Sequence, residues 1–211
     1  MYHVRVGKIM GTYIGAAPKT QTGGRILLEE IIANDDATIA FSESNITATY
    51  GTYEIDLINI TPATDQQRFQ FQVNAVGASG YNETFQTHPA YAEHVNDDAT
   101  NTVVSMDGTT NFAQENGTAE QFLTAEVGNG AAESLCGNMI FYEPADTTFV
   151  TMFRAFITAY QYADASYTHY TGGYIHNSGS TTAFAVDDIR FSFPSGNIAT
   201  GKFRLYGVDY G

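Results

Sequence analysis

Short runs in which apolar and polar residues strictly alternate limit the fold of this chain more than any other feature. In the clearest run, residues 68–75, Phe69, Phe71 and Val73 alternate with arginine, glutamine and asparagine. A period of two is typical of a β-strand with one buried face, and an amphipathic helix does not produce it. Similar runs recur along the chain between turns rich in glycine, asparagine and aspartate.

The composition favours the same fold class. The chain of 211 residues has 14 Tyr, 14 Phe and 20 Gly but only 9 Lys plus Arg. Aromatic residues favour strands, whereas lysine and arginine are common helix formers. We therefore expect an all-β protein, an antiparallel β-sandwich of jelly-roll or lectin-like order over residues 25–211, preceded by an extended N-terminal arm at residues 1–24.

The strands are predicted from the alternation and from the turns between them. They are expected at residues 25–33, 37–41, 52–60, 68–75, 81–86, 102–106, 121–127, 135–142, 148–160, 167–176, 183–193 and 202–208. Pro62 should end the third of these because proline cannot donate to a ladder. The stretch from Thr87 to Asn116 is polar and poorly periodic, so we expect a long surface excursion there apart from the short strand at Thr102–Met106.

The last two runs predict a β-hairpin. They flank a turn from Pro194 to Gly201, and Phe191 would face Phe203 and Leu205 across it. The wording Ser-Gly-Asn-Ile-Ala-x-Gly-x-Phe-x-Leu-Tyr-Gly, which begins at Ser195, resembles the closing hairpin of small β-sandwich virion proteins of tailed phages, especially marine ones.

A second block, from Ala48 to Asp65, resembles the same group. Together the two likenesses cover residues 37–75 and 185–208. The resemblance implies a virion structural protein and carries no catalytic residues. It therefore suggests a setting for the chain and no chemistry.

Charge is unevenly distributed along the chain. Residues 1–25 contain Arg5, Lys8, Lys19 and Arg25 and no acid, whereas the rest of the chain has 5 basic and 23 acidic residues. The part of the chain after residue 25 is acidic enough to repel the phosphates of a nucleic acid. This charge argues against nucleic-acid binding by the folded domain. The basic segment could be a flexible end with a few charges, an assembly arm that docks on an acidic neighbour, or a nucleic-acid-binding tail. We expect the assembly arm, because a cationic peptide on an anionic surface gains steering and register.

No sequence motif predicts catalysis, a cofactor or a metal. Nucleophile elbows, zinc-protease motifs, P-loops and dinucleotide fingerprints are missing from the sequence. His88 and His94 lie near Glu93 and Asp97, but their spacing matches no zinc signature, so a solvated or interface loop is expected there. A calcium ion gathered from separate loops stays an alternative. Cys136, the only cysteine, lies in an apolar run and is expected to be buried.

Tyrosines and histidines are the candidates for a ligand or interface surface. The predicted residues are His88, Tyr91, His94, Tyr160, Tyr162, Tyr167, Tyr170 and Tyr174. Exposed tyrosines can contact another protein or stack on sugar rings. The alternative is that half of them fill the rim of the core and hydrogen-bond locally.

These observations predict a non-enzymatic virion structural protein of a tailed phage, most simply a capsid decoration or cement protein. A tail-fibre or receptor-binding module that recognises a host surface glycan is the second role, and a cellular carbohydrate-binding module the third. We expect a homo-oligomer, a trimer, that contacts other virion proteins of capsid or tail. No segment resembles a signal peptide or a membrane span, so the chain is expected to be made in the host cytoplasm, without membrane insertion, and to end in the virion.

Overall fold

The computed structural model describes residues 24–78, 80–95, 102–106, 108, 111–177 and 182–209. In these residues the chain forms 13 strands, and every pair of neighbouring strands is antiparallel. The predicted all-β antiparallel sandwich is therefore confirmed. The first described strand begins at Gly24, and residues 1–23 lie outside the described part.

A large sheet forms one layer of the sandwich. Its strands lie in the spatial order β1 (Gly24–Asp36), β13 (Ile198–Asp209), β3 (Thr52–Pro62), β9 (Leu135–Tyr142), β10 (Thr151–Gln161), β11 (Ala165–His176), β5 (Thr84–Val95) and β6 (Thr102–Met106). A short strand, β7 (Glu115–Gly117), also pairs with β5. As predicted, β3 ends at Pro62.

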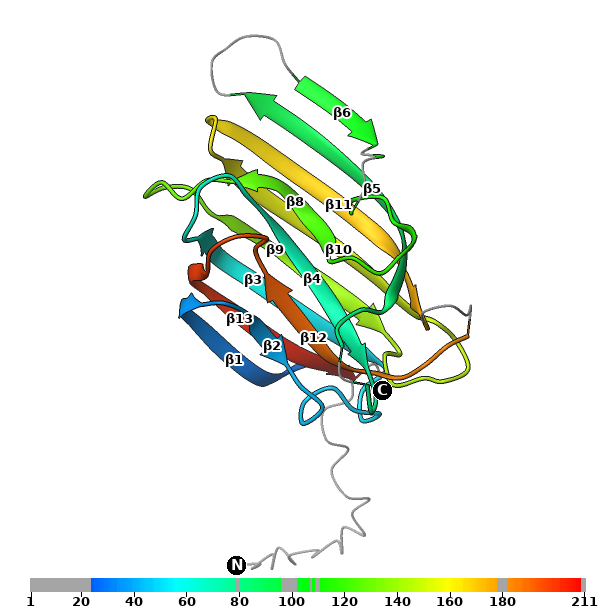
Figure 1. The fold of residues 1–211 in the computed structure, drawn as a ribbon. Helices are drawn as coiled ribbons and strands as arrows, with labels where there is room; N and C mark the ends of the chain where they lie inside the picture. The colour runs from blue at the N-terminus through cyan, green and yellow to red at the C-terminus, as the bar shows by residue number, and fades with distance from the viewer. Residues whose placement is uncertain are drawn as a thin grey trace, which may run out of the picture.

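A small sheet forms the other layer. Its order is β2 (Ile39–Phe41), β12 (Val186–Ser192), β4 (Gln67–Ala75) and β8 (Gln121–Val127). Figure 1 shows these four strands lying in front of the large sheet, while β6 extends beyond them at the end of the large sheet away from β1. The two layers are joined at one edge by a single pair, Gln161 with Val127.

Phenylalanine dominates the core between the two layers. Phe69 and Phe191 of the small sheet stack with ring centroids 5.5 Å apart, and Phe191 lies 5.5 Å from Phe203 of the large sheet. Phe71 likewise lies 5.1 Å from Phe153 of the large sheet. Each such pair adds about 1 kcal/mol beyond its buried area. The inward positions predicted in residues 68–75 are therefore confirmed.

The predicted C-terminal hairpin is wrong. β12 pairs with β2 and β4, whereas β13 pairs with β1 and β3, so the connection between them crosses from one layer to the other. Phe191 does face Phe203, but across the core and not along a ladder. Alternation reports which side chains share a face, and a hairpin and a crossing between layers present the same pattern.

The polar stretch Thr87–Asn116 is more regular than predicted. β5 continues through it to Val95, and β6 and β7 follow; only β6 was expected. None of the residues from Ala90 to Val95 is buried, because this part of the large sheet extends beyond the small sheet. A strand that is poorly covered on both faces does not need apolar residues at alternate positions. Its sequence therefore lacks the alternation from which a strand is predicted.

The outward face of β4 is also covered. Gln72 is fully buried, and its Nε2 donates to the carbonyl oxygens of Glu83, Thr118 and Ala119 at 3.1, 3.2 and 3.3 Å, while its Oε1 accepts from the Val73 amide at 2.8 Å. Every polar atom of this side chain is thereby satisfied, as burial requires. The small sheet thus offers no open face along β4.

Candidate interaction face

The large sheet has an outer face, which we define as the side turned away from the small sheet. Residues paired across adjacent antiparallel strands point to the same face. One such row crosses the whole sheet and fixes the face. It runs Glu30, Arg204, Asp56, Asn138, Phe156, Tyr170, Ala90 and Met106.

Large apolar side chains gather on the half of this face formed by β9, β10, β11, β5 and β6. They are Met106 (68 % exposed), Met152 (57 %), Phe156 (53 %), Tyr170 (46 %) and Tyr142 (36 %), and we call them the apolar band. Met152 pairs with Tyr142, and Phe156 pairs with Tyr170, so four of the five are direct cross-strand neighbours. Large apolar side chains exposed together on one face mark binding sites on soluble proteins.

A hollow of about 280 Å³ lies within the apolar band, lined by Asn138, Ile140, Arg154, Ala155, Phe156 and Tyr170. Gly172 is the cross-strand partner of Arg154, and the Tyr170 ring leans over it, 3.6 Å from where a Cβ would be. Within the described residues Arg154 makes no ion pair. Four other arginines do so, namely Arg25, Arg68, Arg190 and Arg204.

The other half of the outer face carries charged residues that pair with one another. Arg25 binds Glu54 at 2.6 Å and Asp56 at 2.7 Å, with its guanidinium 3.9 Å from the Tyr206 ring centroid. Arg25 was predicted as part of the assembly arm, but here it is an anchored residue of β1. The other predicted arm residues, Arg5, Lys8 and Lys19, lie outside the described part of the chain.

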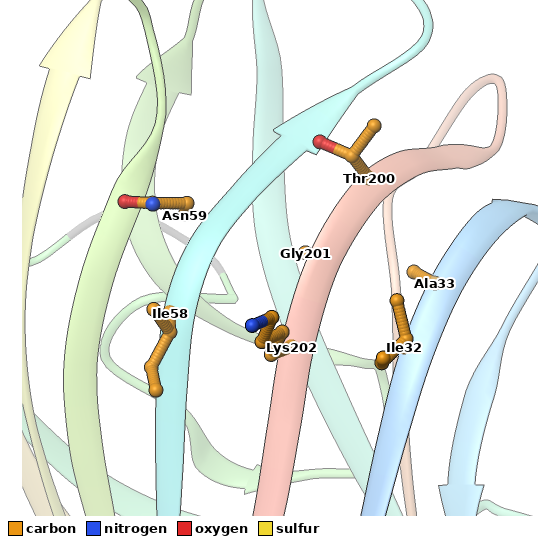
Figure 2. A pocket seen from close by; sticks show the side chains of 7 residues that line it. All are labelled: Ile32, Ala33, Ile58, Asn59, Thr200, Gly201 and Lys202. Carbon is orange, nitrogen blue, oxygen red and sulfur yellow. The ribbon is translucent and has the colours of Figure 1, made fainter.

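A second hollow, of about 340 Å³, opens between β1, β13 and β3 (Figure 2). Figure 2 shows Ile32 and Ile58 on the strands that flank Lys202 of β13. Asn59, at the rim, has φ of 50° at a bulge in β3. The hollow is therefore an apolar depression with one amine beside it, next to the last part of β1.

The predicted tyrosine and histidine surface is divided between the two faces. Alternation along β5, β10 and β11 directs His88, His94, Tyr160, Tyr170 and Tyr174 to the outer face. Of these, Tyr170 belongs to the apolar band, whereas the Tyr160 hydroxyl donates to Asp164 Oδ1 at 2.8 Å, which raises the Tyr160 pKa. Tyr162 is exposed in the turn that joins β10 to β11.

Tyr91 and Tyr167 lie on the inner side instead. Their rings are 5.6 and 5.7 Å from the buried His169, and Phe112 stacks on the same imidazole at 5.7 Å. The Ala125 amide donates to His169 Nε2 at 3.0 Å. Burial, then a hydrogen bond to Glu93, raises the pKa of Tyr167 far above its ordinary value. Tyr91 and Tyr167 therefore fill the rim of the core, which was the alternative to an exposed ligand or interface surface.

Of the five residues of the apolar band, only Tyr170 was predicted from the sequence as a surface residue. Met152, Arg154 and Phe156 occupy one face of a predicted strand whose other face is also apolar, Phe153, Ala155 and Ile157. A strand that is apolar on both faces is either covered twice or presents an apolar surface to a partner. That signal was available in residues 151–157.

Cys136 is exposed, so the prediction that it is buried is wrong. The apolar run around it alternates like any other strand: Leu135, Met139 and Phe141 point inwards, and Cys136 points to the outer face. Its Sγ donates to Asn59 Oδ1 at 3.2 Å. Gly137 allows close strand contact there, because a Cβ would lie 2.3 Å from the Phe156 carbonyl oxygen.

The described residues contain no cluster of three or more histidine, cysteine or acidic side chains that could hold a metal ion. Glu93 points to the opposite side of β5 from His88 and His94, and Asp97 lies outside the described residues. In the part of the chain that the structure describes, no helix is long and apolar enough to cross a membrane. Comparisons with protein-family models, with curated proteins and with solved structures found no match.

Proposed function

We propose that this chain is a non-enzymatic structural protein of a tailed-phage particle that decorates the capsid and docks through its outer face. The apolar band is the observation that carries the proposal. Methionine, tyrosine, phenylalanine and arginine are enriched in the cores of protein interfaces, and these are the residue types of the band and its hollow. The likeness of residues 37–75 and 185–208 to phage virion proteins supports the setting.

The charge distribution supports a docked protein over a nucleic-acid-binding one. The chain has a net charge of −14, and four of the six basic residues after residue 23 are neutralised by carboxylates. A stable interface buries about 800 Å² on each partner. The apolar band would form the centre of such an interface and the polar residues around it the rim. Assembly as a homotrimer with other virion proteins as partners belongs to the same proposal.

A glycan-binding role in the tail is the second candidate, and the Arg154 hollow favours it. Phe156 and Tyr170 provide half-exposed rings beside a guanidinium without a carboxylate partner among the described residues. Aromatic rings can stack on sugar rings, and guanidinium binds carboxylate in a bidentate fork. A saccharide that carries a carboxylate is the ligand that this combination suits.

Cryo-electron microscopy of purified particles tests the location. Hundreds of copies in icosahedral density on the shell are expected, whereas density confined to the tail would overturn the decoration role in favour of the second candidate. Absence of the protein from purified particles would contradict both the decoration role and the tail role.

Substitution of the band tests the docking face. A Met152→Ser, Phe156→Ser, Tyr170→Ser variant should fold but join particles at least tenfold less, because 1.4 kcal/mol is a factor of ten in binding. Val76→Ser, at an exposed apolar residue next to the small sheet, is the matched control and should join normally. Normal incorporation of the folded triple variant would contradict docking through this face.

A further inference from the structure

The long strand β1 is an open edge of the large sheet. In the described part of the chain β1 pairs with β13 alone, and Figure 1 shows it at the end of the sheet opposite β6. It is 13 residues long, whereas β2 and β6, at other sheet ends, have 3 and 5 residues. Short edges are protected from unwanted pairing, but a long open edge offers unpaired amides and carbonyls to another strand. In β1 the Asn34 amide already donates to Asp36 Oδ2 and the Asp35 carbonyl accepts from Asn197 Nδ2, so the open part of the edge lies before Asn34.

The side chains of this edge are apolar and acidic. Ile26, Leu27 and Ile32 are large and about half exposed. The strand also carries two pairs of neighbouring acids, Glu29-Glu30 and Asp35-Asp36. Arg204 binds Glu30, and the one base of the strand, Arg25, is held by Glu54 and Asp56. In parallel pairing, two β1 edges would place acids beside acids, which opposes that arrangement. A basic strand is therefore the complementary partner.

The same chain contains such a strand sequence. In Tyr2–Ile9, Tyr2, Val4 and Val6 alternate with His3 and Arg5, and Lys8 follows. Residues 1–23 carry three basic residues and no acid. β-Branched residues at alternate positions favour an extended strand that can join a sheet edge. This segment lies outside the described residues.

We propose that residues 2–9 of a second copy of this chain add to β1 as a further strand. The 14 residues from 10 to 23 extend to roughly 45 Å, which is as long as the roughly 40 Å of β1 itself. Hairpin loops within a domain usually have only about 2 to 5 residues, so this length suits a linker that reaches a neighbour. The choice of a second copy rests on the proposed assembly function; the choice of β1 as the site does not.

The hollow in Figure 2 adds a place for a side chain of the incoming strand. It opens beside Ile32, near the end of β1 that is far from Gly24. An apolar side chain on the outer side of the added strand would lie next to Ile32 and cover its exposed surface.

Cross-linking between two differently tagged full-length chains tests the proposal. Both chains carry Cys136→Ser to remove the exposed thiol; one adds Val4→Cys, and the other adds a single cysteine at Ile26, Leu28 or Ile32. A disulfide needs Cβ atoms about 4 Å apart, so only neighbouring strands react. We expect mixed dimers for at least one position and protection of the β1 amides from hydrogen exchange.

Charge reversal supplies the control. Arg5→Glu with Lys8→Glu should lower the yield of mixed dimer at least fivefold, whereas Lys19→Glu, in the linker, should change it less than twofold. A chain with both cysteines that cross-links only within itself would overturn the second copy as the source. No cross-link at any β1 position would overturn β1 as the site. Neither result bears on the apolar band, whose particle test is separate.

Discussion

Cys136 shows how far a single side chain can depart from what its neighbours suggest. It stands among Leu135, Met139 and Phe141, yet strand alternation places its sulfur on the outer face. We predict that the native protein reacts with one equivalent of a maleimide within minutes, without denaturant, because exposure governs access to a thiol. Mass spectrometry measures the modification, and Cys136→Ser is the control. Reaction only after unfolding would show that Cys136 is covered, for instance by another copy.

Asp187 is a buried carboxylate that lowers the stability of the protein at neutral pH. Burial, together with the neighbouring Asp188 and Glu43, raises its pKa. A raised pKa means that the folded protein binds the proton more tightly than the unfolded chain. The stabilisation is complete below the ordinary carboxyl pKa, near 4, and is lost as the pH rises through the raised value.

We therefore predict that Asp187→Asn raises the melting temperature at pH 7 by about 2 to 4 °C, which corresponds to roughly 1 kcal/mol. The gain should shrink towards zero near pH 3.5, where the aspartate is already neutral. Differential scanning calorimetry at both values measures it. Glu115→Gln, at an exposed carboxylate, is the control and should show no gain. An equal gain at both pH values would show that charge is not the cause.

At the scale of elements, β11 depends on one of its two adjacent glycines. A Cβ at Gly173 would lie 2.2 Å from the Gln86 carbonyl oxygen and 2.9 Å from Thr87 Cα, both backbone atoms of β5. At Gly172 the nearest atoms would be 3.6 Å away, in the Tyr170 ring. The two positions thus differ in space, although both lie in the same strand.

Gly173→Ala should accordingly destabilise the protein by about 1 to 3 kcal/mol, the usual cost of overpacking. Gly172→Ala is the matched variant and should change stability by less than about 0.5 kcal/mol. Urea unfolding followed by circular dichroism gives both values. Equal effects of the two substitutions would mean that β5 and β11 are not packed as closely as described.

The positions of the strands can be predicted from the sequence more reliably than the pairing between strands. β6 and the strand around Phe71 follow directly from alternation and turns, and both are found. Neighbouring runs were paired as a hairpin at the C-terminal end, but β12 and β13 lie in different layers. Alternation fixes the buried face of each strand, whereas the partner is decided by packing between layers, which no local pattern records.

The candidate face was predictable only in part, for a related reason. Tyr170 was expected at a surface and lies in the apolar band, but Tyr91 and Tyr167 pack around His169. Residue type alone does not distinguish these positions, because tyrosine serves core rims and interfaces equally well. Only the strand register shows that Phe156 and Tyr170 are neighbours.

At the scale of the whole molecule, the two layers share one core and should unfold together. Phe191 of the small sheet contacts Phe69 in its own layer and Phe203 in the other. We predict that Phe191→Ala costs about 3 to 5 kcal/mol and shifts the far-ultraviolet and tyrosine-fluorescence transitions equally. Protection from hydrogen exchange should weaken in both layers. Two separated transitions would show that the layers are independent.

The position of β13 between β1 and β3 has a consequence for how the protein is made. β1 and β3 leave the ribosome early, but the strand that joins them is the last one described. The large sheet therefore cannot close before residues 198–209 are made, and its assembly depends on contacts between distant parts of the chain, which form slowly. Until residues 198–209 emerge, the apolar strands are open to aggregation. Chaperone occupancy before β13 is available should therefore govern the yield of this protein more than the stability of its finished fold.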